Sequence, residues 1–190
     1  MKKKATSLSA VFAVFFLAAS TVCVMAVSAG AAEVGYRKLM LGDSREKVRD
    51  IIKKNFEGEY KVTNESENAL ALRKMVVDKT ALLIELIFDH KSILYKINVK
   101  IRKIPGNPDP DEVVKVIEEK YGAPSKREIT NTLDLIAHWY PDNGRYEIFF
   151  HNISSWDKFD VQYTDTLLEK QKERYDTEKN RKPVKKELDF

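Results

Sequence analysis

The sequence predicts a two-layer α+β fold in which helices pack on an antiparallel sheet. Apolar residues recur at helical spacing in two segments, apolar and polar residues alternate in several others, and short turn signals join the alternating segments. Runs of strands joined by short turns form antiparallel sheets, and a helix before each run can cover one face. The chain has 190 residues, of which 43% are hydrophobic and 33% charged, as in a globular protein with one core.

Residues 1–32 have the pattern of an export signal. Three lysines at positions 2–4 precede a long uncharged stretch, and small residues at 29–31 fit a signal peptidase site. We therefore expect a bacterial protein that is periplasmic or secreted and begins at Ala32 or Glu33. The alternative is a leader that is retained as an anchor, in which case this segment alone would contact a membrane.

Removal of the leader changes both the charge and the cysteine content. It takes away three of the 33 basic residues, so that 30 face 29 acidic residues and the net charge falls from +4 to +1. A nucleic-acid-binding protein needs a strong basic excess, and nucleic acid is therefore excluded as a partner. The single cysteine, Cys23, lies in the leader, and Thr21 and Val22 before it do not fit a lipoprotein signal. The mature chain then has no disulfide and no thiol ligand.

The α+β domain is expected at 33–164, and its first repeat at 36–104. Asp43 can cap a helix and Glu46 can reach back to the cap, after which apolar residues recur at helical spacing until Gly58. Alternating segments then predict strands, of which the last is the clearest, with one buried and one wet face. These strands are expected at 60–63, 70–77, 81–88 and 93–104.

The second repeat, at 105–164, has the same order. A helix is predicted from the cap Asp109, with Pro110 at its first position, and Asn143-Gly144 predicts a hairpin turn. Strands are expected at 126–130, 133–140, 145–153 and 159–163. Asp109 and Glu112 lie 66 residues after Asp43 and Glu46, which we interpret as a tandem duplication. The alternative is that any two capped amphipathic helices align this well.

Residues 165–190 form a charged tail. Fifteen of these 26 residues are charged, eight basic and seven acidic, and such a segment cannot build a core. We expect a solvated helix to about Asn180 and a frayed or disordered end after it.

Two strings carry a resemblance to known proteins. Residues 41–44 read Leu-Gly-Asp-Ser before an apolar helix, and residues 121–124 read Tyr-Gly-Ala-Pro before a strand with Trp139. The pattern from Leu41 to Tyr163 resembles the small lipoprotein of the outer-membrane β-barrel assembly machine and the β-lactamase inhibitory protein. The chain lacks the lipid-attached cysteine of the first family. The resemblance implies a noncatalytic, protein-binding role through analogy of fold.

The residues give no pattern for catalysis, for a metal or for a cofactor. In a hairpin centred on the Asn143-Gly144 turn, paired residues sum to about 287, so His138 opposes Phe149 and His151 opposes Ile136. Neither histidine then has a second metal ligand directly opposite, and a zinc site needs three or four. Ser154 lies in no nucleophile motif, and the scattered glycines form no phosphate-binding loop. The sequence thus predicts no enzyme, no cofactor and no metal site.

The functional candidate is the sheet face opposite the helices. Aromatic rings among hydrogen-bonding and cationic groups are typical of the centres of protein interfaces. We expect this face to bind an envelope or periplasmic protein of unknown identity. The alternatives are a small amphipathic ligand or envelope component held in an aromatic concavity, and a solvated face partly covered by the tail. The predicted face comprises Lys96, Asn98, Lys100, Arg102, Ile136, His138, Tyr140, Phe149 and His151.

Overall fold

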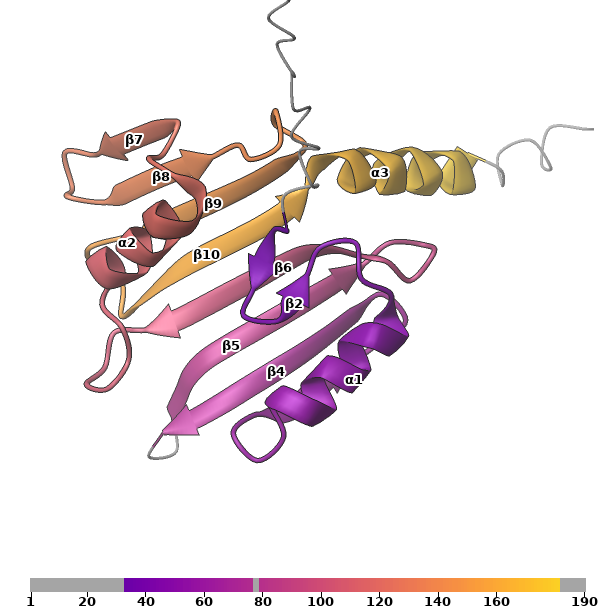
Figure 1. Ribbon diagram of the computed structural model, residues 1–190, viewed down its shortest axis with the longest axis horizontal. Coiled ribbons are helices and arrows are strands. Elements are labelled where there is room, and N and C mark those ends of the chain that lie inside the picture. The colour runs from indigo at the N-terminus through magenta and orange to yellow at the C-terminus, as the bar shows by residue number, and fades with distance from the viewer. Residues whose placement is uncertain (1–32, 77–78, 182–190) are drawn as a thin grey trace, which may run out of the picture. The chain divides into compact units, whose positions relative to one another are not determined.

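The computed structural model describes residues 33–76 and 79–181, and the predicted signal segment lies outside these residues. The described part contains three helices and ten strands in the order that Figure 1 shows. They are β1 (Gly35–Tyr36), β2 (Leu39–Met40), α1 (Arg45–Asn55), β3 (Lys61–Glu65), β4 (Ala69–Val76), β5 (Lys79–Phe88), β6 (Leu94–Arg102), α2 (Pro110–Tyr121), β7 (Lys126–Ile129), β8 (Leu135–Trp139), β9 (Tyr146–Asn152), β10 (Lys158–Asp165) and α3 (Thr166–Arg181).

Eight of the strands form one antiparallel sheet, and β1 and β2 form a separate hairpin. The strand order in the large sheet is β3-β4-β5-β6-β10-β9-β8-β7. Each half is a helix followed by a four-stranded meander, and the last strands of the halves, β6 and β10, pair at the centre. The predicted α+β class with a large antiparallel sheet is confirmed, and both predicted repeats contain the same succession of elements.

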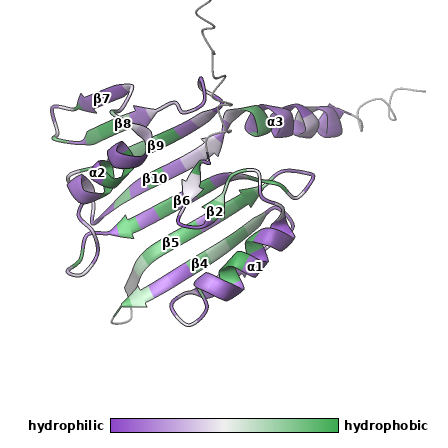
Figure 2. Ribbon diagram, in the orientation of Figure 1, coloured by the Kyte–Doolittle hydropathy of each residue, from purple (hydrophilic) through white to green (hydrophobic). Residues whose placement is uncertain are grey.

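The core lies on one face of this sheet. On β6 the buried Ile97, Val99 and Ile101 alternate with half-buried polar residues. Figure 1 shows α1 and α2 on the same side of the sheet, and their side chains Val48 and Ile117 belong to the same apolar cluster as the strand residues. Figure 2 shows the inner strand β5 as largely hydrophobic and α3 as largely hydrophilic. The opposite side of the sheet carries the alternate, more polar residues.

The two helix starts differ from each other in one respect. At α2 the prediction is confirmed: Asp109 accepts a hydrogen bond from the Glu112 backbone N–H, and the Glu112 side chain accepts one from the Asp109 backbone. At α1 the predicted cap Asp43 is wrong, because Ser44 is the N-cap and its hydroxyl accepts from the Lys47 backbone N–H. The offset between the caps is therefore 65 rather than 66 residues.

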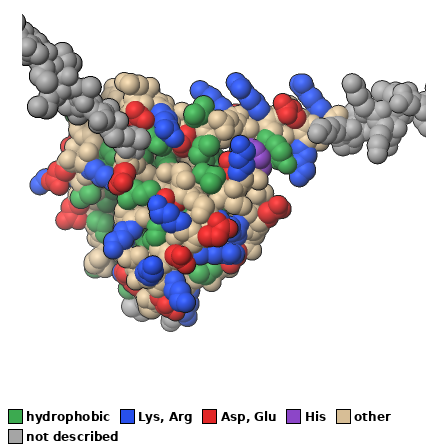
Figure 3. All heavy atoms as spheres, turned by 45° about the vertical axis from the view of Figure 1, so that its right-hand side comes forward, with side chains coloured by type: hydrophobic (Ala, Val, Ile, Leu, Met, Phe, Trp, Pro, Cys, Tyr) green, Lys and Arg blue, Asp and Glu red, His purple; other side chains and the backbone are tan. Residues whose placement is uncertain are grey.

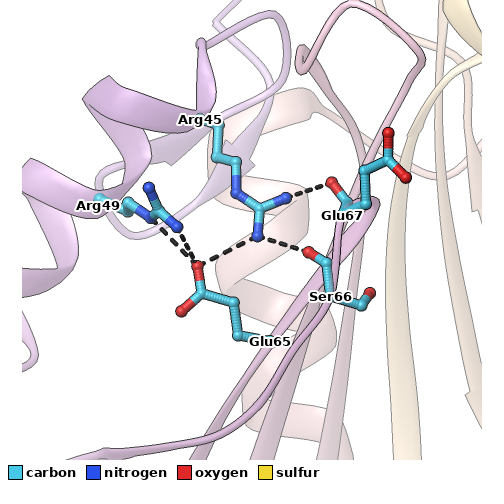
Figure 4. A network of polar contacts seen from close by, with 5 residues as sticks. All are labelled: Arg45, Arg49, Glu65, Ser66 and Glu67. Atoms are coloured by element: carbon cyan, nitrogen blue, oxygen red, sulfur yellow. Dashed lines mark hydrogen bonds and ion pairs between the residues drawn. The ribbon is translucent and has the colours of Figure 1, made fainter.

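The start of α1 is fastened to the turn between β3 and β4. Figure 4 shows the Arg45 guanidinium pointing at this turn, where it donates to the carbonyl oxygens of Ser66 and Glu67 and to the Glu65 carboxylate. Arg49 reaches the same carboxylate from the next turn of the helix. Arg45 is 8% exposed, and its charge is balanced by these acceptors.

The hairpin between β8 and β9 has the predicted turn. Asp142, Asn143 and Gly144 all have positive φ, which short polar residues and glycine tolerate best. The resulting register pairs His138 with Phe149, as the turn position predicted.

The tail begins as a helix, as predicted. Asp165 accepts hydrogen bonds from the backbone N–H groups of Leu167 and Leu168 at the start of α3, and no residue of α3 is buried. Figure 3 shows basic and acidic side chains interspersed on this side of the molecule, α3 included. Among residues 33–76 and 79–181, no helix has the length and apolar character needed to cross a membrane.

Candidate functional site: the open sheet face

The nine residues predicted to bind a partner all lie on the sheet face turned away from α1 and α2, which we call the open face. Eight are half-buried and alternate along β6, β8 and β9 with buried core residues, and Tyr140 continues the alternation beyond β8. The prediction that they share one face is therefore correct in its geometry. Strand β10 lies between β6 and β9, so the predicted residues of β6 do not touch those of β9.

Two rows of paired residues cross the four adjacent strands β6, β10, β9 and β8 on this face. One row runs Lys100, Asp160, His151, Ile136, and the other runs Asn98, Gln162, Phe149, His138. Asp160 and Gln162 of β10 were missed by the sequence prediction. The signal was present, because the buried Phe159, Val161 and Tyr163 on β10 imply that the residues between them face the other side.

Four rings adjoin one another on β8 and β9, and we call them the ring cluster: His138, Tyr140, Phe149 and His151. The centroid of the His138 ring lies 4.8 Å from that of Phe149 and 6.0 Å from that of Tyr140, and Phe149 lies 5.7 Å from His151. The Nδ1 atom of His138 is 2.9 Å from Oε1 of Glu147, which fixes the orientation of that ring. Tyr140 is 46% exposed and is the most accessible member.

Acidic neighbours accompany the cations of the open face. Lys100 pairs with Glu85 at 2.9 Å, and Arg102 pairs with Asp157 at 3.4 Å. Lys96 pairs with Glu169 of α3, so this residue faces the tail helix rather than open solvent. Each of the three predicted cations of the open face therefore has a carboxylate partner.

Asp160 is the acidic group at the centre of the open face. Its Oδ1 atom is buried and has no hydrogen-bond partner among the residues that the structure describes. Burial raises the pKa of the Asp160 carboxyl, and the positive charges of Lys100, Lys158 and His151 act in the opposite direction. A carboxyl whose ionised form is poorly solvated can accept a hydrogen bond from a group brought by a partner.

The tail helix covers one end of the open face. Besides the ion pair between Lys96 and Glu169, the rings of His90 and Tyr175 stack with centroids 4.1 Å apart. Burial raises the pKa of Tyr95, which is buried near charged residues of α3. Helix α3 thus covers the Lys96 end of β6 and also contacts β10 and β9.

The structure supports the loop interpretation of Ser154. Its hydroxyl donates to the Thr132 carbonyl at 2.6 Å, and its backbone N–H donates to Asp134 at 2.8 Å. The backbone hydrogen bond from Ser154, together with one from the Thr132 hydroxyl, lowers the pKa of Asp134. Both bonds of Ser154 join the loop after β9 to the loop before β8. Among the described residues no group of three or more His, Cys, Asp or Glu side chains is arranged to hold a metal ion.

A cavity lies on the core side of the sheet, opposite the open face. It has a volume of about 890 Å³ and lies between α2, the β1–β2 hairpin and the core face of β6 and β10. The ring cluster does not line it. This concavity is rich in tyrosine, with Tyr36, Tyr60, Tyr121 and Tyr163 in its lining.

Comparisons with known proteins identify no family. No protein-family model matches the chain, and no curated protein matches it. A search of solved structures gives YjgB, a DUF4309 family protein from Bacillus subtilis subsp. subtilis str. 168, with 10% identity and a TM-score of 0.36. The match covers 68% of this chain and 86% of YjgB, and a likeness at this level carries no argument about function. The fold thus defines an α+β protein made of two helix-and-meander units.

Proposed function

We propose that this chain is an exported, noncatalytic protein-binding module that acts in the periplasm or cell envelope through its open face. The observation that carries the proposal is the ring cluster, in which four rings from β8, β9 and the residue after β8 lie together on the open face. Aromatic residues at the centre of a patch, surrounded by polar groups, are the composition that stable protein interfaces favour.

The surroundings of the ring cluster fit the rim of such an interface. Ion pairs such as Lys100 with Glu85 lie on the same face, on β6 and β5, and expose part of both side chains. Strand β10 separates them from the ring cluster. Rim charges of this kind add little affinity, but they orient a partner and exclude wrong ones. The centre of binding is therefore placed at β8 and β9 and not at the lysines of β6, where α3 already occupies the face.

A photo-crosslinking experiment in cells tests this proposal. A benzoylphenylalanine at Tyr140 should trap the partner, because this position lies in the ring cluster and is 46% exposed. The matched control is the same group at Ile129, which is 67% exposed and alternates to the opposite face of β7. Equal products at both positions, or none at Tyr140, would contradict the proposal.

A second variant separates contact from mere proximity. Phe149→Ala in the Tyr140 crosslinking background should reduce the trapped product roughly tenfold or more, as loss of an interface anchor does. Because Phe149 is half-buried, circular dichroism and urea unfolding of this variant must first show a folded protein. A folded variant that gives an unchanged yield would remove the ring cluster from the interface.

Export is the other part of the proposal. It is supported by the leader pattern of residues 1–32, and it requires that protein recovered from the periplasm lacks Cys23. Intact mass and N-terminal sequencing should give a chain that begins near Ala32. Recovery of the complete leader in a membrane fraction would replace the exported form by an anchored one.

A further inference from the structure

The groove beside α2 is a second surface with the properties of a binding site. Its volume of about 890 Å³ lies within the range of about 300–1,000 Å³ that is usual for ligand pockets. Leu82, Ile101 and Val161 form an apolar floor, and they are 2–6% exposed. The groove is on the side of the sheet opposite the ring cluster, and an inference about it is independent of the proposed function.

The wall that α2 contributes is apolar where it borders the groove. Val113, Val116 and Ile117 line it, and Val116 is 64% exposed. Covering an exposed apolar side chain with an apolar body removes its surface from water, and this lowers the free energy. Floor and wall together can therefore hold the apolar part of a ligand.

Phenol groups gather between this wall and the hairpin. Tyr36 and Tyr163 have ring centroids 6.5 Å apart, and Tyr121 lines the same groove. Burial raises the pKa of Tyr163, and Tyr121 and Tyr36 act in the same direction. Tyr60 is 8% exposed, and its hydroxyl is buried without a hydrogen-bond partner in the described part of the chain. Burial raises the pKa of Tyr60 to about 12, so this phenol stays protonated and remains a hydrogen-bond donor at neutral pH.

Cations flank these phenols from both walls. The Arg37 guanidinium lies 5.8 Å from the centroid of the Tyr36 ring, and Lys120 Nζ lies 4.9 Å from that of Tyr121. Arg37 shares Glu59 with Lys74, whereas Lys120 has no carboxylate partner within residues 33–76 and 79–181.

The charges around the groove have a small cationic excess. Arg37, Lys74, Lys115 and Lys120 line it together with Glu112 and Glu119, and Glu59 pairs with both Arg37 and Lys74, so four cations face three carboxylates. The Glu112 carboxylate is already engaged in the capping box of α2.

We propose that this groove binds a small amphipathic anion, whose apolar body lies along the floor and α2 and whose anionic group meets the phenols beside Arg37 and Lys120. Phenol hydroxyls and cations donate to a carboxylate, and charge-assisted hydrogen bonds of this kind are stronger than neutral ones. An apolar floor and wall with phenols and cations beside them match a ligand that has an apolar body and one anionic group.

Dodecanoate, below the concentration at which it forms micelles, is a suitable probe. Isothermal titration of the full chain should show saturable binding at one site per chain. Dodecyltrimethylammonium has the same apolar body with a positive group, and it should bind at least about tenfold more weakly because the cations of the groove repel it. Equal binding of the two surfactants would show that only apolar contact is present, and it would overturn the proposal.

Two pairs of variants test the placement. Lys120→Glu should weaken dodecanoate binding by about tenfold, while Lys54→Glu, in the last turn of α1, should leave it unchanged. Val116→Asp should weaken it similarly, while Ile129→Asp, at a matched exposure of 67%, should have no effect. All four positions are exposed, so the variants should fold, and circular dichroism is the check on their folding.

Other occupants give distinct results. If Val116→Asp dissociates a dimer in sedimentation, the groove is an interface between two copies of the chain. If an acidic peptide binds in the groove and dodecanoate does not, the occupant is a protein segment. Either result would overturn the proposal, and neither would affect the test at Tyr140.

Discussion

Trp139 is buried in the core, and its indole N–H donates to the Gly122 carbonyl at 2.9 Å. The bond links β8 to the residue that ends α2, so one side chain both fills volume and holds the helix end. Trp156, the other tryptophan, is 48% exposed in a loop. The sequence places Trp139 in the strand expected at 133–140, whereas the bond to Gly122 depends on where α2 ends.

Replacement of this tryptophan should be costly. Trp139→Ala is expected to lower the free energy of unfolding by about 3–5 kcal/mol, since a large buried ring leaves a cavity. Trp156→Ala should change it by less than about 0.5 kcal/mol, as for most surface substitutions. Urea unfolding of both variants is the measurement, and similar midpoints would show that Trp139 is not part of the core.

Asp160 gives a prediction about pH. Its pKa in the folded protein is raised by burial, with Glu85 acting in the same direction. The folded state then holds the proton more tightly than the unfolded state, so the stability linked to this group is present at low pH. It is lost as the pH rises from the ordinary carboxyl pKa through the raised value.

Asp160→Asn removes this titration. Relative to the wild type, the variant should therefore gain stability on going from acid to neutral pH, and urea midpoints of the two proteins at both pH values measure this. Other carboxyl groups titrate in both proteins and cancel in the difference. A difference between the two proteins that does not change with pH would mean that Asp160 is well solvated.

At the scale of elements, the helix caps show what local sequence can decide. Asp43 and Ser44 are adjacent, and both residue types are good caps. Ser44 has the extended backbone that a cap needs, while Asp43 uses its carbonyl to accept from the Leu94 backbone N–H and its carboxylate to bind Lys47. Whether Asp43 or Ser44 caps the helix therefore depends on β6, which begins at Leu94 and lies outside the local sequence around α1.

Substitutions at the N-caps of α1 and α2 test whether each cap stabilises its helix. Ser44→Ala and Asp109→Ala should each lower the free energy of unfolding by about 1 kcal/mol, because each leaves a helix N–H group without its acceptor. Ser155→Ala, in an exposed loop, is the control and should have no effect. Unfolding by guanidinium chloride measures all three, and equal values for Ser44→Ala and Ser155→Ala would disprove the cap at Ser44.

At the scale of the whole molecule, α3 and the sheet are joined through partly buried contacts. Lys96 and Glu169 are 19% and 32% exposed, and they connect β6 to a helix that begins directly after β10. The single variants Lys96→Glu and Glu169→Lys should each destabilise the protein, and the double exchange should restore part of the loss.

The coupling in this double-mutant cycle is expected to be about 1 kcal/mol, the upper part of the range for such pairs. Urea unfolding of the four proteins measures it. Additive losses would show that α3 is not held against the sheet in solution.

Local sequence patterns predict the three helices, the strands of the large sheet and the two faces of that sheet. Alternation fixes which residues of a strand share a face, because the side-chain period is two, and the turn at Asn143-Gly144 sets the register of β8 against β9. Only the tertiary structure decided that β10 lies between β6 and β9, that Glu169 covers Lys96 and that tyrosines 36, 60, 121 and 163 line one groove. These contacts join residues far apart in the chain, and their formation depends on how the two helix-and-meander units pair through β6 and β10, which no local period encodes.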